Sequence, residues 1–268
     1  MPELPEVETI KRDLIKCLLG KTIKSVFVND TMVVRQPDPK LFVKRLIGKT
    51  IVDIRRRGKA VIFELNNGDF LVVQLIMTGQ LIYGKKLKTS RVIFELSDNK
   101  YLNYNDQRRF GRLSAVGDLN QIKFFQTLGI EPLSREFHYD WLYRELSKRK
   151  TPIKSLLMNQ NFVAGIGNIY ASEILFRCGI NPKRPARTLK PKEIRLLHTT
   201  TVEVLNEAIR LRGSSVNTYR DVNGQKGRFL NRIRVYGKEN EECAICKTPI
   251  TRIVLSGRST FFCKRCQS

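Results

Sequence analysis

Four cysteines near the carboxyl end of the chain have the spacing of a metal site. Cys243 and Cys246 form one Cys-x-x-Cys pair, and Cys263 and Cys266 form a second pair after sixteen intervening residues. Two such pairs supply four thiolates to one tetrahedral zinc ion and leave no coordination position open for water. We therefore expect one structural zinc ion, which folds a segment too short to hold itself together. The alternative is four cysteines without a metal.

The segment between the two cysteine pairs could carry a phosphate ligand. It reads as two strands, 250–255 and 259–262, joined at Ser256-Gly257-Arg258. Arg258 would then stand at the tip of a hairpin, where a guanidinium can grip a phosphate with two parallel hydrogen bonds. On spacing alone, Arg258 could equally be an ordinary surface arginine.

The amino terminus is the second candidate for chemistry. Met1 precedes Pro2, a small residue, and removal of the initiator methionine would expose a secondary amine. An α-amine has a pKa of about 8, so a useful fraction is neutral at physiological pH, whereas a lysine titrates near ~10.4. A neutral amine can attack an aldehydic or anomeric carbon and give an iminium, and Glu3 could donate or accept the proton. From the residues alone, most such starts are simply chain ends.

An amphipathic helix is expected directly after these residues. Apolar side chains recur at three- and four-residue intervals over residues 4–19, and Pro5 suits the first turn of a helix. Glu6 and Glu8 complement the positive end of the helix dipole. The same dipole should lower the pKa of an amine at position 2.

Short β-rich runs follow the helix, and the pattern then becomes helical. The runs 22–28, 51–57, 60–65, 69–76, 91–96, 100–105 and 112–116 predict an antiparallel sandwich or barrel. The expected helices are 138–148, 152–159, 167–178 and 190–211. A stretch without periodicity from Arg212 to Gly227 reads as a long loop, and loops of that length are usually functional or disordered.

The charge of the chain points to a polyanionic partner. Its net charge is +24, from 49 lysines and arginines against 25 acidic residues, and the basic residues are spread along the sequence. This spread favours a folded face that binds nucleic acid, and a merely solvated basic surface is the alternative. No run of eighteen or more apolar residues, signal peptide or lipidation motif is present, so we expect a cytosolic protein without membrane contact. The 268 residues suffice for two or three domains, and we expect a monomer.

Several ordered sequence blocks resemble the formamidopyrimidine-DNA glycosylases of bacterial base-excision repair. The opening Pro-Glu-Leu-Pro-Glu-Val-Glu-Thr at residues 2–9 resembles the signature of that family. Further blocks match in the same order over nearly the entire chain up to the four-cysteine hairpin. They are Arg-Arg-Gly-Lys at 56–59, Met-Thr-Gly at 77–79, Arg-Arg-Phe-Gly at 108–111, Leu-Gly-Ile-Glu-Pro-Leu at 128–133, Gly-Ile-Gly-Asn-Ile-Tyr-Ala-Ser-Glu at 165–173 and Val-Tyr-Gly at 235–237.

The resemblance implies an α+β multidomain fold in three parts. These are an N-terminal catalytic antiparallel β-sandwich with flanking helices at 1–130, a helix-two-turn-helix DNA-binding domain at 131–236, and a zinc-finger β-hairpin domain at 237–268. The loop 213–226 corresponds to the lesion-recognition loop of the family. Its residues match poorly, so its individual contacts are not assigned.

The resemblance also implies a bifunctional DNA glycosylase and abasic-site lyase that acts on oxidised purines in duplex DNA, in the cytoplasm with the bacterial nucleoid. Pro2 would attack the anomeric carbon while Glu3 assists protonation and opening of the deoxyribose, which leaves a Schiff base. Successive β and δ eliminations would then leave a one-nucleotide gap. The residues that would hold phosphates around the everted nucleotide are Lys59, Asn168 and Arg258, of which Lys59 and Arg258 belong to the catalytic set, with Lys154 and Tyr170 nearby.

Three further side chains would fill the void left by the everted base. By the same resemblance, Met77 would enter the void, Arg109 would face the orphaned partner base, and Phe110 would wedge into the base stack. Eversion costs free energy that such side chains partly offset. Ordinary core packing is the alternative for Met77 and Phe110.

Some positions depart from the family pattern. Gln74 stands where the family commonly has a histidine, Lys88-Thr89-Ser90 replaces a Lys-His-Asp-His run, and Gln107 replaces a proline. These departures leave the phosphate contacts and the preferred opposite base open.

Two rival functions also remain at this point. One is a glycosylase of endonuclease VIII type, which removes oxidised pyrimidines with the same nucleophile. The other is a non-catalytic protein that uses its basic charge to bind nucleic acid.

Overall fold

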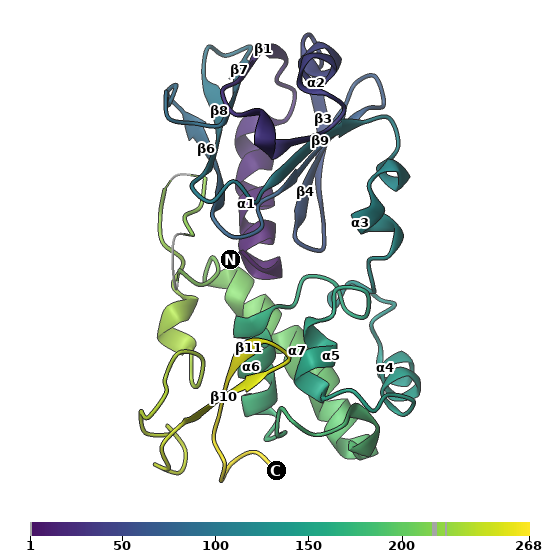
Figure 1. Ribbon diagram of the computed structural model, residues 1–268, viewed down its shortest axis with the longest axis vertical. Helices are drawn as coiled ribbons and strands as arrows, with labels where there is room; N and C mark the ends of the chain where they lie inside the picture. Colours follow the sequence, from purple (N-terminus) through teal and green to yellow (C-terminus); the bar gives the residue numbers. More distant parts are fainter. Residues whose placement is uncertain (1, 216–218, 223) are drawn as a thin grey trace. The chain divides into compact units, whose positions relative to one another are not determined.

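The computed structural model describes residues 2–215, 219–222 and 224–268, so Met1, whose removal is expected, and part of the 213–226 loop lie outside the described residues. The chain forms two compact units (Figure 1). The first unit contains the residues up to 127 together with 211–230, and the second contains 128–210 together with 231–268.

The first unit is built around two β-sheets. The four-stranded sheet has the order β1-β7-β8-β6, and the five-stranded sheet has the order β2-β9-β5-β4-β3. The strands are β1 (Ile23–Val28), β2 (Val34–Gln36), β3 (Ile51–Arg57), β4 (Ala60–Leu65), β5 (Phe70–Gln74), β6 (Gly79–Gly84), β7 (Val92–Leu96), β8 (Tyr101–Asp106) and β9 (Arg112–Val116). The helices of this unit are α1 (Leu4–Leu18), α2 (Pro39–Leu46) and α3 (Lys123–Gln126), with the short 3-10 helices η1 (Thr31–Val33) and η2 (Leu119–Gln121). The expected sandwich is confirmed, except that β2 runs parallel to β9.

One hydrophobic core joins the two sheets and α1. Leu14 of α1, Phe63 of β4 and Phe94 of β7 are each at most 1% exposed and belong to the same cluster. The five-stranded sheet also buries its other face, where Ile62 of β4 belongs to a second cluster that packs with Phe125 of α3. Successive residues of a strand point to opposite faces, so these two cores explain why residues 60–63 of β4 are all apolar.

The second unit is mainly helical and carries a two-stranded hairpin. Its elements are α4 (Tyr139–Leu146), α5 (Ile153–Met158), α6 (Asn168–Arg177), η3 (Ala186–Thr188), α7 (Pro191–Arg210), β10 (Thr251–Leu255) and β11 (Arg258–Phe262), and η4 (Phe229–Arg232) leads into it. Helix α6 packs against α5, α7 and β11, so it is buried on nearly every side. No helix of the described ranges is long and apolar enough to cross a membrane.

Candidate nucleic-acid interface and catalytic centre

Pro2 and Glu3 lie directly before α1 and are both buried. Glu3 is the N-cap residue of the helix, and its backbone N–H donates to Oε2 of Glu6 over 2.8 Å. Pro5 occupies the first turn, where a backbone N–H would have no partner within the helix. Pro2 therefore lies at the positive end of the α1 dipole, as the sequence predicts.

Glu6 joins the start of α1 to the segment 211–230. Its Oε2 accepts from the N–H of Glu3, and its Oε1 accepts from the N–H of Ser214 over 2.6 Å. Gly213 has a φ of +79°, and a Cβ at this position would lie 2.7 Å from the Glu6 carboxylate. Only glycine fits such a backbone at this distance. One carboxylate thus ties the described part of the 213–226 loop to the residues beside Pro2.

A second contact fastens the same segment to α1. The guanidinium of Arg212 lies 2.5 Å from Asp13 of α1 and 2.6 Å from Asp221. Burial alone would lower the pKa of Arg212, but its hydrogen bonds to the two carboxylates outweigh this and raise it. Arg212 is therefore a charged cross-link at any physiological pH. The absence of periodicity predicted a loop here but none of these contacts.

Lys59 lies in the two-residue turn of the β3–β4 hairpin. The turn begins at Gly58, whose φ is +56°, a value that favours glycine. The side chain of Arg56, 9% exposed, donates from Nε to Glu8 of α1 over 3.1 Å and from Nη1 to the carbonyl oxygen of Gly58 over 3.0 Å. The buried Arg56–Glu8 pair holds the hairpin turn that carries Lys59 against α1. Glu8 lies less than two helical turns after Glu3.

Glu8 is the acceptor for three cations. Besides Arg56, it pairs with Lys11 and Arg12 of its own helix, each at 2.8 Å. Burial would raise the pKa of Glu8, but the hydrogen bonds from Lys11 and Arg12 and the charge of Arg56 lower it overall. Glu8 is therefore ionised at neutral pH and keeps Arg56 in place.

The loops that contain Met77 and Arg109 are both attached to Asp106, a residue that the sequence analysis missed. Asp106 is 2% exposed. Its Oδ1 accepts from the hydroxyl of Thr78 and from the N–H of Arg108 at 3.2 Å. Its Oδ2 accepts from the N–H of Gly111 at 2.7 Å and from the hydroxyl of Tyr104 at 3.3 Å. Burial, followed by the Asp106 charge, raises the pKa of Tyr104, so its hydroxyl stays a donor.

The three expected void-filling side chains lie on these loops. Phe110 is 47% exposed, and the guanidinium carbon of Arg108 lies 4.7 Å from the centre of its ring. Arg109 has a φ of +58°, which is uncommon outside glycine, and its side chain is 49% exposed. Met77 is half-buried. Core packing therefore does not account for Phe110, whereas the role of all three in DNA binding remains a prediction.

In the second unit, the side chains of Lys154 and Asn168 lie against β11 of the β10–β11 hairpin. Lys154 is 1% exposed, and its Nζ donates to Oδ1 of Asn168 at 2.5 Å, to Thr260 Oγ1 at 2.7 Å and to the carbonyl oxygen of Ser259 at 3.2 Å. Asn168 Nδ2 donates to the same Ser259 oxygen at 3.0 Å. The ammonium of Lys154 thus fixes Asn168, the first residue of α6, against β11. Tyr170, two residues later in α6, is fully buried.

Arg258 is the first residue of β11 and directly follows the hairpin turn. The turn consists of Ser256 and Gly257, with φ values of +49° and +72°, as a type I′ turn requires. The sequence predicted Arg258 within the turn, but the turn has only two residues and Arg258 belongs to the strand. Arg258 is exposed, and its guanidinium has no hydrogen bond or ion pair with the residues that the structure describes.

The four cysteine sulfurs form one cluster. Cys243 Sγ lies 3.8 Å from Cys266 Sγ, Cys246 Sγ lies 3.4 Å from Cys263 Sγ, and all four atoms lie within 4.8 Å of one another. A tetrahedral ion with zinc–sulfur bonds of about 2.3 Å needs sulfurs about 3.8 Å apart. The cluster fits a zinc ion, and the expected zinc site is confirmed.

Glu173 explains why two of the sequence blocks belong together. This residue of α6 is fully buried, and its carboxylate accepts from the N–H groups of Arg234, Val235 and Tyr236 at 2.8 to 3.0 Å. Burial raises the pKa of Glu173, and the three backbone donors oppose that rise. The Glu173 carboxylate fixes the Val-Tyr-Gly block at 235–237 to helix α6.

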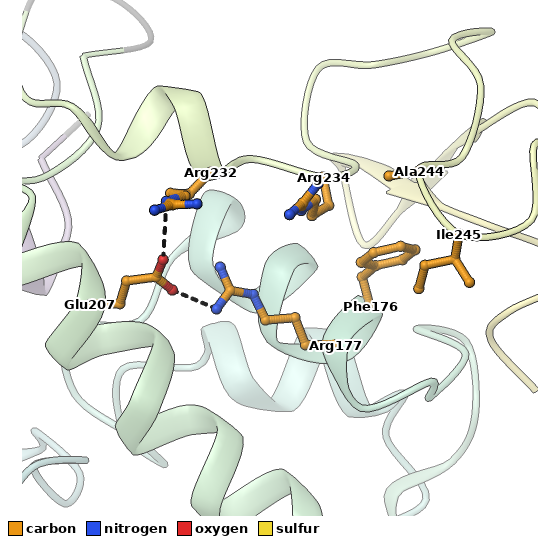
Figure 2. Close-up of a pocket in the computed structure, with 7 residues that line it drawn as sticks. All are labelled: Phe176, Arg177, Glu207, Arg232, Arg234, Ala244 and Ile245. Carbon is orange, nitrogen blue, oxygen red and sulfur yellow. Dashed lines mark hydrogen bonds and ion pairs between the residues drawn. The ribbon is translucent and has the colours of Figure 1, made fainter.

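A surface cleft of about 460 Å³ lies at the end of α6 opposite to Asn168 (Figure 2). Its lining residues are Phe176, Arg177, Glu207, Arg232, Arg234, Ala244 and Ile245. Glu207 of α7 pairs with Arg177 at 2.6 Å and with Arg232 at 3.6 Å, so the cleft marks where η4 is fastened to α6 and α7. The two ends of α6 are about 14 Å apart, and none of the expected site residues lines the cleft.

Comparisons with known proteins agree with this architecture. Residues 1–113 match the formamidopyrimidine-DNA glycosylase N-terminal domain, residues 128–220 its H2TH domain, and residues 240–268 the zinc finger found in FPG and IleRS. Formamidopyrimidine-DNA glycosylases of Wolbachia sp. subsp. Brugia malayi and Geobacillus kaustophilus are 42% and 41% identical to the chain, and the matches cover 100% of all sequences.

Solved structures of similar proteins superpose over nearly the whole chain. The Fpg protein of Thermus thermophilus has a TM-score of 0.90 at 40% identity, covering 99% of this chain and 98% of its own. The Fpg of Lactococcus lactis, in a complex with DNA that contains an abasic site, has a TM-score of 0.92 at 35% identity, covering 99% of both chains.

The two-sheet unit, the helical module and the four-cysteine hairpin together define a zinc-finger DNA glycosylase of DNA-damage repair. More narrowly, the chain belongs to the formamidopyrimidine-DNA glycosylase family, which confirms the resemblance seen in the sequence.

Proposed function

We propose that the protein is a bifunctional DNA glycosylase and abasic-site lyase that removes oxidised purines from double-stranded DNA of the bacterial nucleoid. The observation that carries this proposal is the setting of Pro2 and Glu3. They are buried at the start of α1, beside the hairpin that carries Lys59 and the carboxylate that holds the segment 211–230. The Lactococcus lactis relative, solved with abasic-site DNA and as a variant with DNA that contains Fapy-dG, supports the same substrate class.

In the proposed reaction, the lone pair of the Pro2 nitrogen attacks C1′ of the damaged nucleotide. The positive end of the α1 dipole disfavours the protonated amine and so increases the nucleophilic fraction. The bond between C1′ and the base breaks, and the base leaves with a proton. Glu3 donates a proton to the ring oxygen, the sugar opens, and the nitrogen and C1′ form an iminium.

The iminium then drives strand cleavage because it withdraws electrons from the neighbouring carbon. Loss of a proton from C2′ breaks the C3′–oxygen bond and releases the 3′ phosphate. A second elimination releases the 5′ phosphate, and hydrolysis of the remaining Schiff base frees Pro2. The product is a gap of one nucleotide.

The remaining site residues would hold the DNA in register. Lys59, Asn168 and Arg258 would bind phosphates, whose hydrogen bonds position the duplex without reading its sequence. Lys154 and Tyr170 are buried, so in this proposal they act by holding α6 and the zinc hairpin in place.

The proposal is tested by borohydride trapping on a duplex with one abasic site. Reduction should join the mature protein to DNA through Pro2, with mass spectrometry confirming that Met1 is absent. A chain with an amino-terminal extension, and the variant Pro2→Thr, should give little or no adduct. Pro5→Ala is the matched control, because it changes the next proline of the same helix start and keeps the amine. An undiminished adduct in the extended chain would refute the mechanism, and no adduct with the mature protein would favour the non-catalytic alternative.

The substrate class is tested on duplexes that carry 8-oxoguanine, a formamidopyrimidine or thymine glycol. Preferential cleavage of the two purine lesions is expected. Preference for thymine glycol would instead indicate the endonuclease VIII type of activity.

A further inference from the structure

Asp30 lies just after β1, and its carboxylate faces two arginines. Oδ2 lies 2.9 Å from Nε of Arg109 and 3.6 Å from Nη1 of Arg91. The side chain of Asp30 is 11% exposed, whereas that of Arg109 is 49% exposed. A largely buried carboxylate thus holds the half-exposed guanidinium that we propose faces the orphaned base.

The position of Asp30 is itself well determined. Its N–H donates to the carbonyl oxygen of Arg91 over 3.1 Å, where β1 and β7 begin to pair. Its Oδ1 accepts from the N–H of Met32 at 3.1 Å and so caps η1. Arg91 is fixed in turn, because its Nε donates to the carbonyl oxygen of Asp106 over 3.0 Å. The negative charge at Oδ2 of Asp30 therefore has a fixed position relative to the two loops that Asp106 holds.

The contact holds Arg109 without using its hydrogen-bond donors. Among the described residues, Oδ2 of Asp30 accepts no aligned hydrogen bond and the Arg109 side chain makes none, so the attraction is one of charge. A guanidinium carries five N–H donors. The four N–H groups on its two terminal nitrogens remain available for the acceptor atoms of an unpaired base.

The backbone around Arg109 is already fixed by another carboxylate. Asp106 accepts the N–H groups of Arg108 and Gly111, the residues on either side of the Arg109-Phe110 pair. The main freedom left is the rotation of the long Arg109 side chain. Ordering such a side chain only upon binding would weaken the complex.

We propose that Asp30 is a positioning residue for Arg109, which it orients before DNA binds so that the guanidinium discriminates between orphaned bases. The inference rests on the proposed function, in that Arg109 enters a duplex with an everted nucleotide. It concerns binding alone, so it can be tested without the chemical step.

The test measures binding to duplexes in which a tetrahydrofuran abasic analogue lies opposite each of the four bases. Asp30→Asn keeps the size of the side chain and an oxygen to cap η1 but removes the charge. The matched control is Asp118→Asn, because Asp118 caps η2 in the same way, accepting from Asn120 N–H at 2.8 Å. Asp30→Asn should reduce the spread of Kd values across the four opposite bases by about two- to fivefold, the range expected for a partly exposed ion pair. Asp118→Asn should leave the spread unchanged.

Each other outcome overturns the proposal. A purely structural role would weaken binding to all four duplexes equally and leave the spread intact. In the background Arg109→Ala, Asp30→Asn should have no further effect on the spread, and a full effect there would mean that Asp30 acts through another group. A wild-type protein that binds all four duplexes equally would also refute it. Borohydride trapping, measured separately, distinguishes any of these results from failure of the catalytic mechanism.

Discussion

Replacing Asp106 with alanine should destabilise the first unit far more than the loss of an exposed carboxylate. The change removes the acceptor for the hydroxyls of Thr78 and Tyr104 and for the N–H groups of Arg108 and Gly111. Tyr104 and Gly111 are buried, so water cannot readily replace the lost carboxylate for them. A buried donor left without an acceptor costs about 1–3 kcal/mol. Two such donors give an expected loss of about 2–6 kcal/mol in the free energy of unfolding.

Asp38→Ala provides the matched comparison. Asp38 is exposed and also accepts two backbone N–H groups, those of Lys40 at 3.0 Å and Leu41 at 3.1 Å. Loss of this N-cap should cost only about 1 kcal/mol, because water can solvate the freed N–H groups. The two variants thus differ chiefly in the burial of the donors they leave behind.

Urea unfolding followed by far-ultraviolet circular dichroism measures the loss. The single tryptophan, Trp141, lies in the second unit, so its fluorescence serves as an internal control and should shift little in either variant. Amide hydrogen exchange at Gly111 should become faster in Asp106→Ala alone. Equal losses of stability in Asp106→Ala and Asp38→Ala would show that burial of the donors does not set the cost, and would refute the reasoning.

Three further outcomes are expected. Arg212→Ala should loosen the attachment of the segment 211–230 to α1, seen as faster amide exchange at Ser214, and unchanged exchange would contradict the anchoring role of the Arg212 ion pairs. Removal of zinc by a chelator should unfold the β10–β11 hairpin and weaken DNA binding, and both should return when zinc is restored; chelated protein with full DNA affinity would argue against this. Burial alone would raise the pKa of Asp98, but its hydrogen bonds to Lys21 and Tyr83 lower it overall from 3.8 to about 2. Because the folded-state pKa is the lower one, this contribution to stability is complete above about pH 4 and is lost as the pH falls towards 2, so Asp98→Asn should flatten that part of an acid-unfolding profile.

Elements with a long periodic signal were predictable from the sequence, and short ones were not. Every strand and helix that the analysis expected is present, with ends that differ by at most two residues. The sequence pattern did not predict β6, which has glycine at both ends, or β2, whose parallel partner β9 is distant in sequence and gives no hairpin signal. Helix α2 was not predicted either, although Asp38-Pro39 is a clear helix start and the fully buried Phe42 and Leu46 are four residues apart. The short helix α3 has no capping side chain that would have indicated its start in the sequence.

Some residues of the candidate site were likewise predictable from the sequence, and others were not. The zinc ligands were predictable from spacing because the ligands of one knuckle are neighbours in the chain. Asp106 and Asp30 were not, because an isolated aspartate in a β-rich region carries no local pattern. The contact of Glu6 with Ser214 spans 208 residues, and only the folded chain brings such partners together.

The passage of residues 211–230 through the first unit limits how this protein can be divided. A fragment that stops at residue 127 would lack Ser214 and Arg212, and would leave the carboxylates of Glu6, 1% exposed, and Asp13, 8% exposed, without those donors. The fragment would also lack Tyr219 and Val222, which are buried in the core of the first unit, so it should fold poorly. Chimaeras between relatives would therefore need two exchanged stretches of sequence, the amino-terminal one and this short insert, to transfer one working unit.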